Sequence, residues 1–241
     1  MGFINRLIRK ISKSKSIDDA TTPTFATEDE YYHWFFTQNE SWNKVNPNED
    51  EQLRWNGIMQ FVEEVKNKLG HPMEILDLGC GRGWLTNLLS NYGTIKGIEP
   101  VAAVVQYANK IFPHLNIVAG DSSVLLNSGD AGKFDLVVSS EVLEHVAHDE
   151  KGKFASNIKQ LLKNEGYLII STPRKEVQIE YCELSNLSQP VEEWLLESDV
   201  KQLFIRNSFE VVDFTRLSRN TNVNNKFLEI YQLWLFKKIS S

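Results

Sequence analysis

The most constraining stretch of this chain runs from residue 74 to residue 100, with the sequence EILDLGCGRGWLTNLLSNYGTIKGIEP. Residues 74–78 form a short apolar run that suits a buried parallel strand, and a turn with three glycines follows. Residues 84–91 place leucines on one helical face, and residues 94–98 form a second apolar run ending at Glu99. This order of strand, glycine-rich turn, helix and strand predicts an α/β fold with parallel strands.

The glycine-rich turn has the chemistry of a nucleoside site. Gly79, Gly81 and Gly83 let the backbone approach a ligand because glycine has no Cβ, and the next helix presents free N–H groups at its N-terminus. Glu99 follows Gly79 by twenty positions and is placed to accept both hydroxyls of a ribose. Asp77 can face an amino or amide group from the strand end. The alternative is that the glycines only make a tight turn.

Composition narrows the class of protein. With 241 residues and 41% hydrophobic content, the chain suits one α/β domain with added segments. A net charge of -6 argues against a nucleic-acid-binding surface. Two cysteines, Cys80 and Cys182, cannot build a disulfide framework, so a reducing cytoplasm is the expected location.

The N-terminal residues 1–15 form a short basic amphipathic segment. Such a segment can make weak contact with an anionic membrane surface, and the alternative is an N-terminal helix that packs on the protein itself. We expect no transmembrane helix, because no apolar run is long enough. Residues 12–27 lack a period and predict a linker, so residues 1–27 form the first of three expected regions.

An aromatic-rich segment precedes the glycine turn. Tyr31, Trp34 and Phe35 share one helical face, which indicates either a lid over a small-molecule site or ordinary core packing. Residues 49–69 predict an amphipathic helix ended by a glycine. We therefore expect a helical, aromatic-rich lid over residues 28–72 and the main domain over residues 73–241.

The remaining segments alternate between strands and helices. A loop is expected over residues 175–189, and Ser198 is the expected N-cap of a helix. The expected strands are 115–119, 134–139, 166–171, 209–214 and 228–236, and the expected helices are 101–112, 151–162, 191–196 and 199–205.

Several motifs occur together in order: DLGCGRG, GIEP, GDS, FDLVVSSEVLEHV and GYLIISTPR. Over about residues 75–236 the chain thereby resembles the class I methyltransferases that use S-adenosylmethionine (SAM). The EVLEHV, STPR and QPVEEWL pieces are similar to the branch of ubiquinone-biosynthesis and small-molecule or sugar O-methyltransferases. The resemblance implies a doubly wound, Rossmann-like sheet of seven strands, mostly parallel with the last strand antiparallel, and SAM above the carboxyl ends of its strands.

The same resemblance assigns roles by position. The glycine turn would hold the methionine part of SAM, Glu99 the ribose, and Asp121 with Ser122 the adenine. From the residues alone, Asp121 is equally suited to be a helix N-cap. The expected cofactor-binding residues are Asp77, Gly79, Cys80, Gly81, Gly83, Glu99, Pro100, Asp121, Ser122 and Glu141.

A methyl acceptor with a hydroxyl group also has to lose a proton. His145 follows the fourth strand, and an imidazole suits a base at neutral pH, so we predict His145 as the general base. The alternative is a structural histidine, and His148 is the next candidate base. Glu141, Glu144 and His145 could instead hold a divalent ion, but such ions prefer more oxygen ligands, so no metal is expected.

The sequence predicts a SAM-dependent methyltransferase acting on an oxygen of a small molecule or sugar. The alternatives are a methyltransferase acting on a protein or RNA, and a non-catalytic SAM-binding interaction module. The acidic balance argues against RNA. A dinucleotide-dependent oxidoreductase is disfavoured because the glycine spacing is G-x-G-x-G and not G-x-G-x-x-G.

Overall fold

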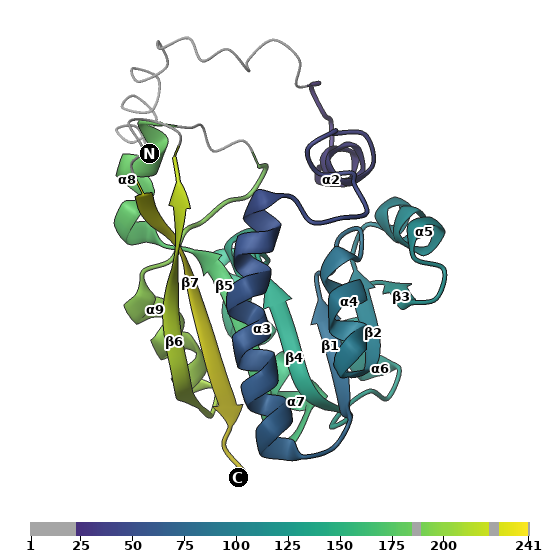
Figure 1. Cartoon of the computed structure of the whole chain (residues 1–241), viewed down its shortest axis with the longest axis vertical. Coiled ribbons are helices and arrows are strands. Elements are labelled where there is room, and N and C mark those ends of the chain that lie inside the picture. Colours follow the sequence, from purple (N-terminus) through teal and green to yellow (C-terminus); the bar gives the residue numbers. More distant parts are fainter. Residues whose placement is uncertain (1–22, 185–188, 222–226, 241) are drawn as a thin grey trace.

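The computed structural model describes residues 23–184, 189–221 and 227–240, which form a three-layer α/β fold (Figure 1). The strands are β1 (Met73–Leu78), β2 (Gly93–Glu99), β3 (Asn116–Ala119), β4 (Phe134–Ser140), β5 (Leu162–Pro173), β6 (Phe209–Asn220) and β7 (Phe227–Lys238). The α-helices are α2 (Glu28–Thr37), α3 (Glu49–Leu69), α4 (Trp84–Leu89), α5 (Ala102–Ile111), α6 (Ser122–Asn127), α7 (Lys151–Leu161), α8 (Gln178–Cys182) and α9 (Glu197–Arg206). Short 3₁₀ turns are η1 (Ser90–Tyr92), η2 (Leu143–His145), η3 (His148–Glu150) and η4 (Lys175–Val177).

The seven strands form one sheet in the order β3-β2-β1-β4-β5-β7-β6. Strands β1 to β5 pair in parallel, and β7 pairs antiparallel with both β5 and β6. Parallel neighbours require crossover connections, which place helices on both faces of the sheet. The predicted doubly wound sheet with an antiparallel last strand is confirmed.

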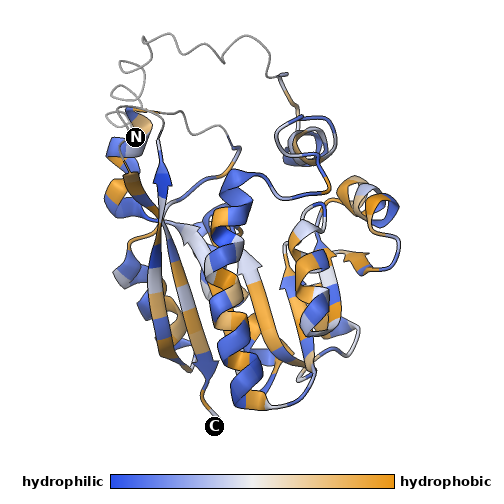
Figure 2. Ribbon diagram, in the orientation of Figure 1, coloured by the Kyte–Doolittle hydropathy of each residue, from blue (hydrophilic) through white to orange (hydrophobic). Residues whose placement is uncertain are grey.

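Two hydrophobic cores lie on opposite faces of this sheet. One contains Ile75 and Leu136 together with residues of α3, α4 and α5. The other contains Leu76 and Val137 together with residues of α6, α7 and α9. Consecutive residues of one strand thus enter different cores, as the pleat requires, and Figure 2 shows the central strands coloured as apolar.

Helix α3 connects the N-terminal segment to the sheet. Asn48 and Glu51 form a capping box at its start, and Gly70 ends it in the left-handed conformation. Ile58, Phe61 and other apolar residues of α3 lie in the first core, where the helix crosses the sheet (Figure 1). The predicted helix at 49–69 is confirmed, and its first turns lie beside the carboxyl ends of the strands.

Three local predictions are wrong. Residues 191–196 are not helical, because their backbone bonds to other segments: Glu193 donates to the Glu144 carbonyl, and Leu195 accepts from Lys175. Ser198 is not an N-cap, since α9 already begins at Glu197. The expected loop at 175–189 contains the turn η4 and helix α8.

The predicted membrane-surface segment, residues 1–15, lies outside the described residues, as does most of the predicted linker. Among the described residues, no helix combines the length and apolar character needed to span a bilayer.

Candidate functional site

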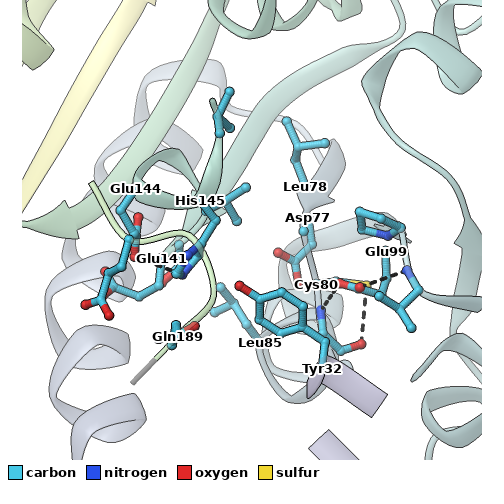
Figure 3. Close-up of a pocket in the computed structure, with 18 of the residues that line it drawn as sticks. Tyr32, Asp77, Leu78, Cys80, Leu85, Glu99, Glu141, Glu144, His145 and Gln189 are labelled. Carbon is cyan, nitrogen blue, oxygen red and sulfur yellow. Dashed lines mark hydrogen bonds and ion pairs between the residues drawn. The ribbon is translucent and has the colours of Figure 1, made fainter. Parts of the chain in front are cut away.

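A cavity of about 520 Å³ lies at the carboxyl ends of β1 to β4 and is bordered by α2. Between β1 and β4 the order of the strands reverses, and ligands of open α/β sheets bind at such a switch point. Figure 3 shows Asp77, Cys80 and Glu99 on one side of the cavity and Glu141, Glu144 and His145 on the other. We call these sides the glycine-turn half and the β4 half.

The glycine-rich turn is shaped by close packing. Gly79 has a φ of 78°, and a Cβ there would lie 2.4 Å from Cγ2 of Val142. Gly81 has a φ of 51°, and a Cβ there would lie 2.9 Å from the ring of Phe36 in α2. A larger residue at either position is therefore strained by its backbone and blocked by its neighbour.

Glu99 closes the turn from the end of β2. Its two carboxylate oxygens each accept a hydrogen bond of 3.1 Å, from the backbone N–H groups of Gly81 and Val101 (Figure 3). Burial raises the pKa of this carboxyl to about 7. Each oxygen keeps a free lone pair, so the group can also accept hydroxyl donors from a ligand.

Asp77 and Cys80 lie at the end of β1 in the same half. Asp77 is buried and accepts a 2.6 Å hydrogen bond from the Thr86 hydroxyl, and burial raises its pKa to about 7. Cys80 is buried, and burial raises the pKa of its thiol well above the ordinary value. Both residues border the cavity, as do Gly79, Gly81, Glu99 and Pro100. Gly83 does not border it and serves instead as the left-handed residue before α4.

Asp121 and Ser122 follow β3 and also border the cavity. Asp121 is the N-cap of α6, accepting hydrogen bonds of 2.8 and 3.1 Å from the N–H groups of Ser123 and Val124. The N-cap alternative for Asp121 is therefore confirmed, and the residue still faces the site. Ser122 accepts a 3.0 Å hydrogen bond from the side chain of Asn157.

The β4 half holds two carboxyl groups in a buried setting. Glu141 has a left-handed backbone, with a φ of 58°, and accepts a 2.9 Å hydrogen bond from the Ser171 hydroxyl. Burial, assisted by repulsion from Glu144, raises the pKa of Glu141 to about 8. Glu144 accepts a 2.9 Å hydrogen bond from the Thr172 hydroxyl, and burial raises its pKa to about 7. A strained backbone is often found at a functional site.

His145 borders the same half and is oriented by the backbone. Its Nδ1 contacts the carbonyl oxygen of Val191, and a carbonyl only accepts, so Nδ1 carries the proton. This leaves Nε2, which lies 3.7 Å from Oε1 of Glu144, as the ring nitrogen that can take a proton. His148 does not border the cavity, since its side chain is 83% exposed and pairs with Glu193.

The structure also bears on the divalent-ion alternative. Within the described ranges, no group of three or more His, Cys, Asp or Glu side chains is arranged to hold a metal ion. Glu141, Glu144 and His145 therefore do not form the ligand set that their spacing suggested.

Helix α2 and the turn after it overlie both halves. Phe36 meets Gly81 in the glycine-turn half, and Tyr32 lies with its ring centroid 6.0 Å from that of His145 in the β4 half. Phe35 stacks on Trp42 at 4.9 Å, and both border the cavity. The sequence identified this aromatic segment, and the structure places it along the site.

Two arginines were not anticipated. Arg82, inside the glycine turn, is fully buried and makes hydrogen bonds of 2.5 and 2.7 Å to Glu51 at the start of α3. Arg54 of α3 is buried and borders the cavity. A signal existed for both: Arg82 stands between two glycines of a buried turn, and Arg54 precedes Ile58 by one helical turn on the inward face.

Comparison with known proteins gives a family match. The sequence profile described as "Methyltransferase domain" matches residues 50–225. The mitochondrial ubiquinone biosynthesis O-methyltransferase of Mus musculus is 39% identical over 117 residues, which cover 46% of this chain and 31% of that protein. The ubiquinone biosynthesis O-methyltransferase of Bradyrhizobium diazoefficiens is 31% identical over 137 residues, covering 54% of this chain and 52% of that protein. The chain thus spans about a third to a half of the length of these relatives.

Solved structures share the fold. The N-methyltransferase NodS from Bradyrhizobium japonicum, in complex with S-adenosylhomocysteine (SAH), superposes with a TM-score of 0.67 at 16% identity. The superposition covers 88% of this chain and 99% of that one. Since the similar proteins include both O- and N-methyltransferases, they do not fix the acceptor atom.

Proposed function

Because this chain belongs to the class I SAM-dependent methyltransferases, we propose that it transfers the methyl group to a hydroxyl oxygen of a small molecule or sugar. SAM is the cofactor, and it supplies a methyl group already activated on a sulfonium sulfur. The protein then has to hold the acceptor in line with that methyl group and remove the acceptor's proton.

In this proposal the glycine-turn half binds SAM. The turn at Gly79 and Gly81 accepts the methionine part, where a Cβ would leave no room. Glu99 uses its free lone pairs for the ribose hydroxyls, and Asp121 with Ser122 borders the adenine. Support comes from the burial of Glu99 and from its bonds to Gly81 and Val101, which fix the carboxylate before a ligand arrives. Asp77, Cys80 and Pro100 complete this wall, Gly83 starts α4 behind it, and Glu141 lies toward the methyl group.

The observation that supports an oxygen atom as the methyl acceptor is the orientation of His145. Its Nδ1 is held by the Val191 carbonyl, so Nε2 is free to accept a proton at the edge of the cavity. A hydroxyl must lose its proton to complete methyl transfer, whereas a neutral amine can attack without a base. We therefore assign His145 as the general base, and α2 as the lid that keeps water from the acceptor.

Methyl transfer from radiolabelled SAM to matched phenols, catechols, sugars and amines tests this proposal. We expect hydroxyl acceptors to be methylated, and His145→Ala to lower turnover roughly 10²–10⁴-fold while SAM affinity is kept. His148→Ala is the matched control, because that side chain is exposed and away from the cavity. Methylation of amines alone, or unchanged turnover in His145→Ala, contradicts the proposal.

A further inference from the structure

The turn that carries His145 is short and is held from outside. It is the 3₁₀ turn η2, which spans three residues, and a turn of this length has few hydrogen bonds of its own. The carbonyl groups of Leu143 and Val146 both accept hydrogen bonds from Nζ of Lys151, at 3.0 Å and 2.5 Å. The side chain of Lys151, at the start of α7, thus holds the backbone before and after His145.

Lys151 also reaches the segment that orients the imidazole ring. Its Nζ pairs with a carboxylate oxygen of Glu193 at 3.2 Å. The backbone N–H group of Glu193 donates a 2.9 Å hydrogen bond to the carbonyl of Glu144, in the same turn as His145. Glu193 comes two residues after Val191, whose carbonyl contacts Nδ1 of His145. The described residues around Val191 belong to no helix or strand, so their place depends on contacts of this kind.

The ammonium group of Lys151 is matched to these partners. A lysine ammonium carries three N–H donors, and the two carbonyl oxygens and the Glu193 carboxylate take one each. The side chain is 6% exposed, and a buried charge is costly unless it is paired and hydrogen-bonded. Because replacing a buried ion pair by apolar residues is often neutral or stabilising, stability alone does not account for a lysine here.

We propose that Lys151 is a positioning residue for the general base: it holds the turn of His145 against the Val191 carbonyl and so fixes the tautomer with the proton on Nδ1. The inference rests on the proposed function and adds a residue that does not border the cavity. In a neutral imidazole, the hydrogen bond of one ring nitrogen decides which nitrogen carries the proton. Without the Val191 carbonyl in reach, the proton can occupy either nitrogen, and Nε2 is then free in only part of the molecules.

Nitrogen-15 NMR of the histidine rings tests this proposal. The full chain, labelled in its five histidines, is studied without ligand at about pH 8, where ordinary imidazoles are neutral. His145→Gln identifies the signals of His145. We expect the unsubstituted protein to hold His145 with the proton on Nδ1, and Lys151→Met to show a mixture of both tautomers. A lysine with a purely structural role would leave the tautomer unchanged.

Further variants locate the effect. Lys159→Met is the matched control, because Lys159 lies on the same helix and donates a 2.9 Å hydrogen bond to the Ser208 hydroxyl, away from the cavity. It should leave the tautomer unchanged. Glu193→Ala removes the bond between Lys151 and the segment of Val191 and should give a partial mixture. Glu193→Gln keeps an acceptor for Lys151 and should restore most of the Nδ1 tautomer.

The proposal is refuted if the Nδ1 tautomer persists in folded Lys151→Met or, should that variant not fold, in Glu193→Ala. A mixture of tautomers in the unsubstituted protein, or an equal change in Lys159→Met, refutes it as well. In the methyl-transfer assay with catechol, Lys151→Met should lower kcat about 10–100-fold and leave KM for SAM unchanged. Absence of transfer to any hydroxyl acceptor by the unsubstituted protein would refute the proposed function, and the NMR result decides the role of Lys151 separately.

Discussion

Breaking the buried ion pair between Arg82 and Glu51 should lower the free energy of unfolding more than breaking an ion pair on the surface. Arg82 connects the glycine turn to the start of α3. Its side chain is 0% exposed and that of Glu51 is 1% exposed. Its Nε also donates a 2.6 Å hydrogen bond to the Lys44 carbonyl, which fixes the segment between α2 and α3.

The expected loss in free energy of unfolding follows from the carboxylate that the substitution Arg82→Met leaves without its partner. The Glu51 carboxylate would stay buried with only its bond from the Asn48 N–H group, at 2.9 Å. Removing one partner of a buried pair costs about 3–5 kcal/mol, since the remaining charge is neither solvated nor paired. The double variant Arg82→Met/Glu51→Met removes both charges and should recover much of this loss.

Urea unfolding followed by tryptophan fluorescence measures the free energy of unfolding. Arg216→Met is the control, because Arg216 pairs with Glu197 and Glu229 with its own side chain 41% exposed, and such pairs contribute about 0–1 kcal/mol. The reasoning is refuted if Arg82→Met destabilises no more than Arg216→Met. It is also refuted if the double variant loses as much free energy of unfolding as Arg82→Met and Glu51→Met lose in sum.

Two further predictions concern the cavity itself. Gly79→Ala should abolish SAM binding and destabilise the fold, whereas Gly70→Ala, at φ 69° with open space around the Cβ position, should show only the backbone penalty of about 1–2 kcal/mol. Calorimetric titration and urea unfolding compare the two, and equal effects contradict the packing argument. The pKa of Glu141 rises from an ordinary 4.5 to about 8 on folding, so the ligand-free folded state holds a proton that the unfolded state releases between these values. The stability that this proton provides is fully present below pH 4.5 and is lost as pH rises through about 8. The melting temperature of Glu141→Gln should therefore rise relative to that of the unsubstituted protein as the pH increases from 5 to 8.5. A difference in melting temperature that stays constant over this range would show that Glu141 is ionised in both the folded and the unfolded state.

The fold could be predicted because its signals are local. The glycine turn, the apolar strands and the capped helix at residues 49–69 each bear their pattern within one segment. Residues 191–196 could not be predicted, since their extended backbone is set by partners distant in sequence, Glu144 and Lys175. Ser198 failed as an N-cap because α9 starts at Glu197, two residues before the predicted start, and its N-cap is Leu196, whose side chain cannot cap.

The candidate site likewise has residues that could be predicted from the sequence and residues that could not. Glu99 and Asp121 could be placed at the cavity because Glu99 ends β2 and Asp121 lies two positions after β3, and parallel strands end at one edge. The roles of Arg54 and Arg82 could not be predicted, because each depends on what surrounds the side chain in three dimensions. Glu51, the partner of Arg82, lies 31 positions away in another element.

The most direct test of the account is calorimetric titration of the purified protein with SAM, with NAD as the control ligand and Glu99→Ala as the control variant. We expect saturable one-site binding of SAM, no binding of NAD, and loss of SAM binding in the folded Glu99→Ala protein. Failure of the folded protein to bind SAM, or unchanged affinity in Glu99→Ala, would contradict it.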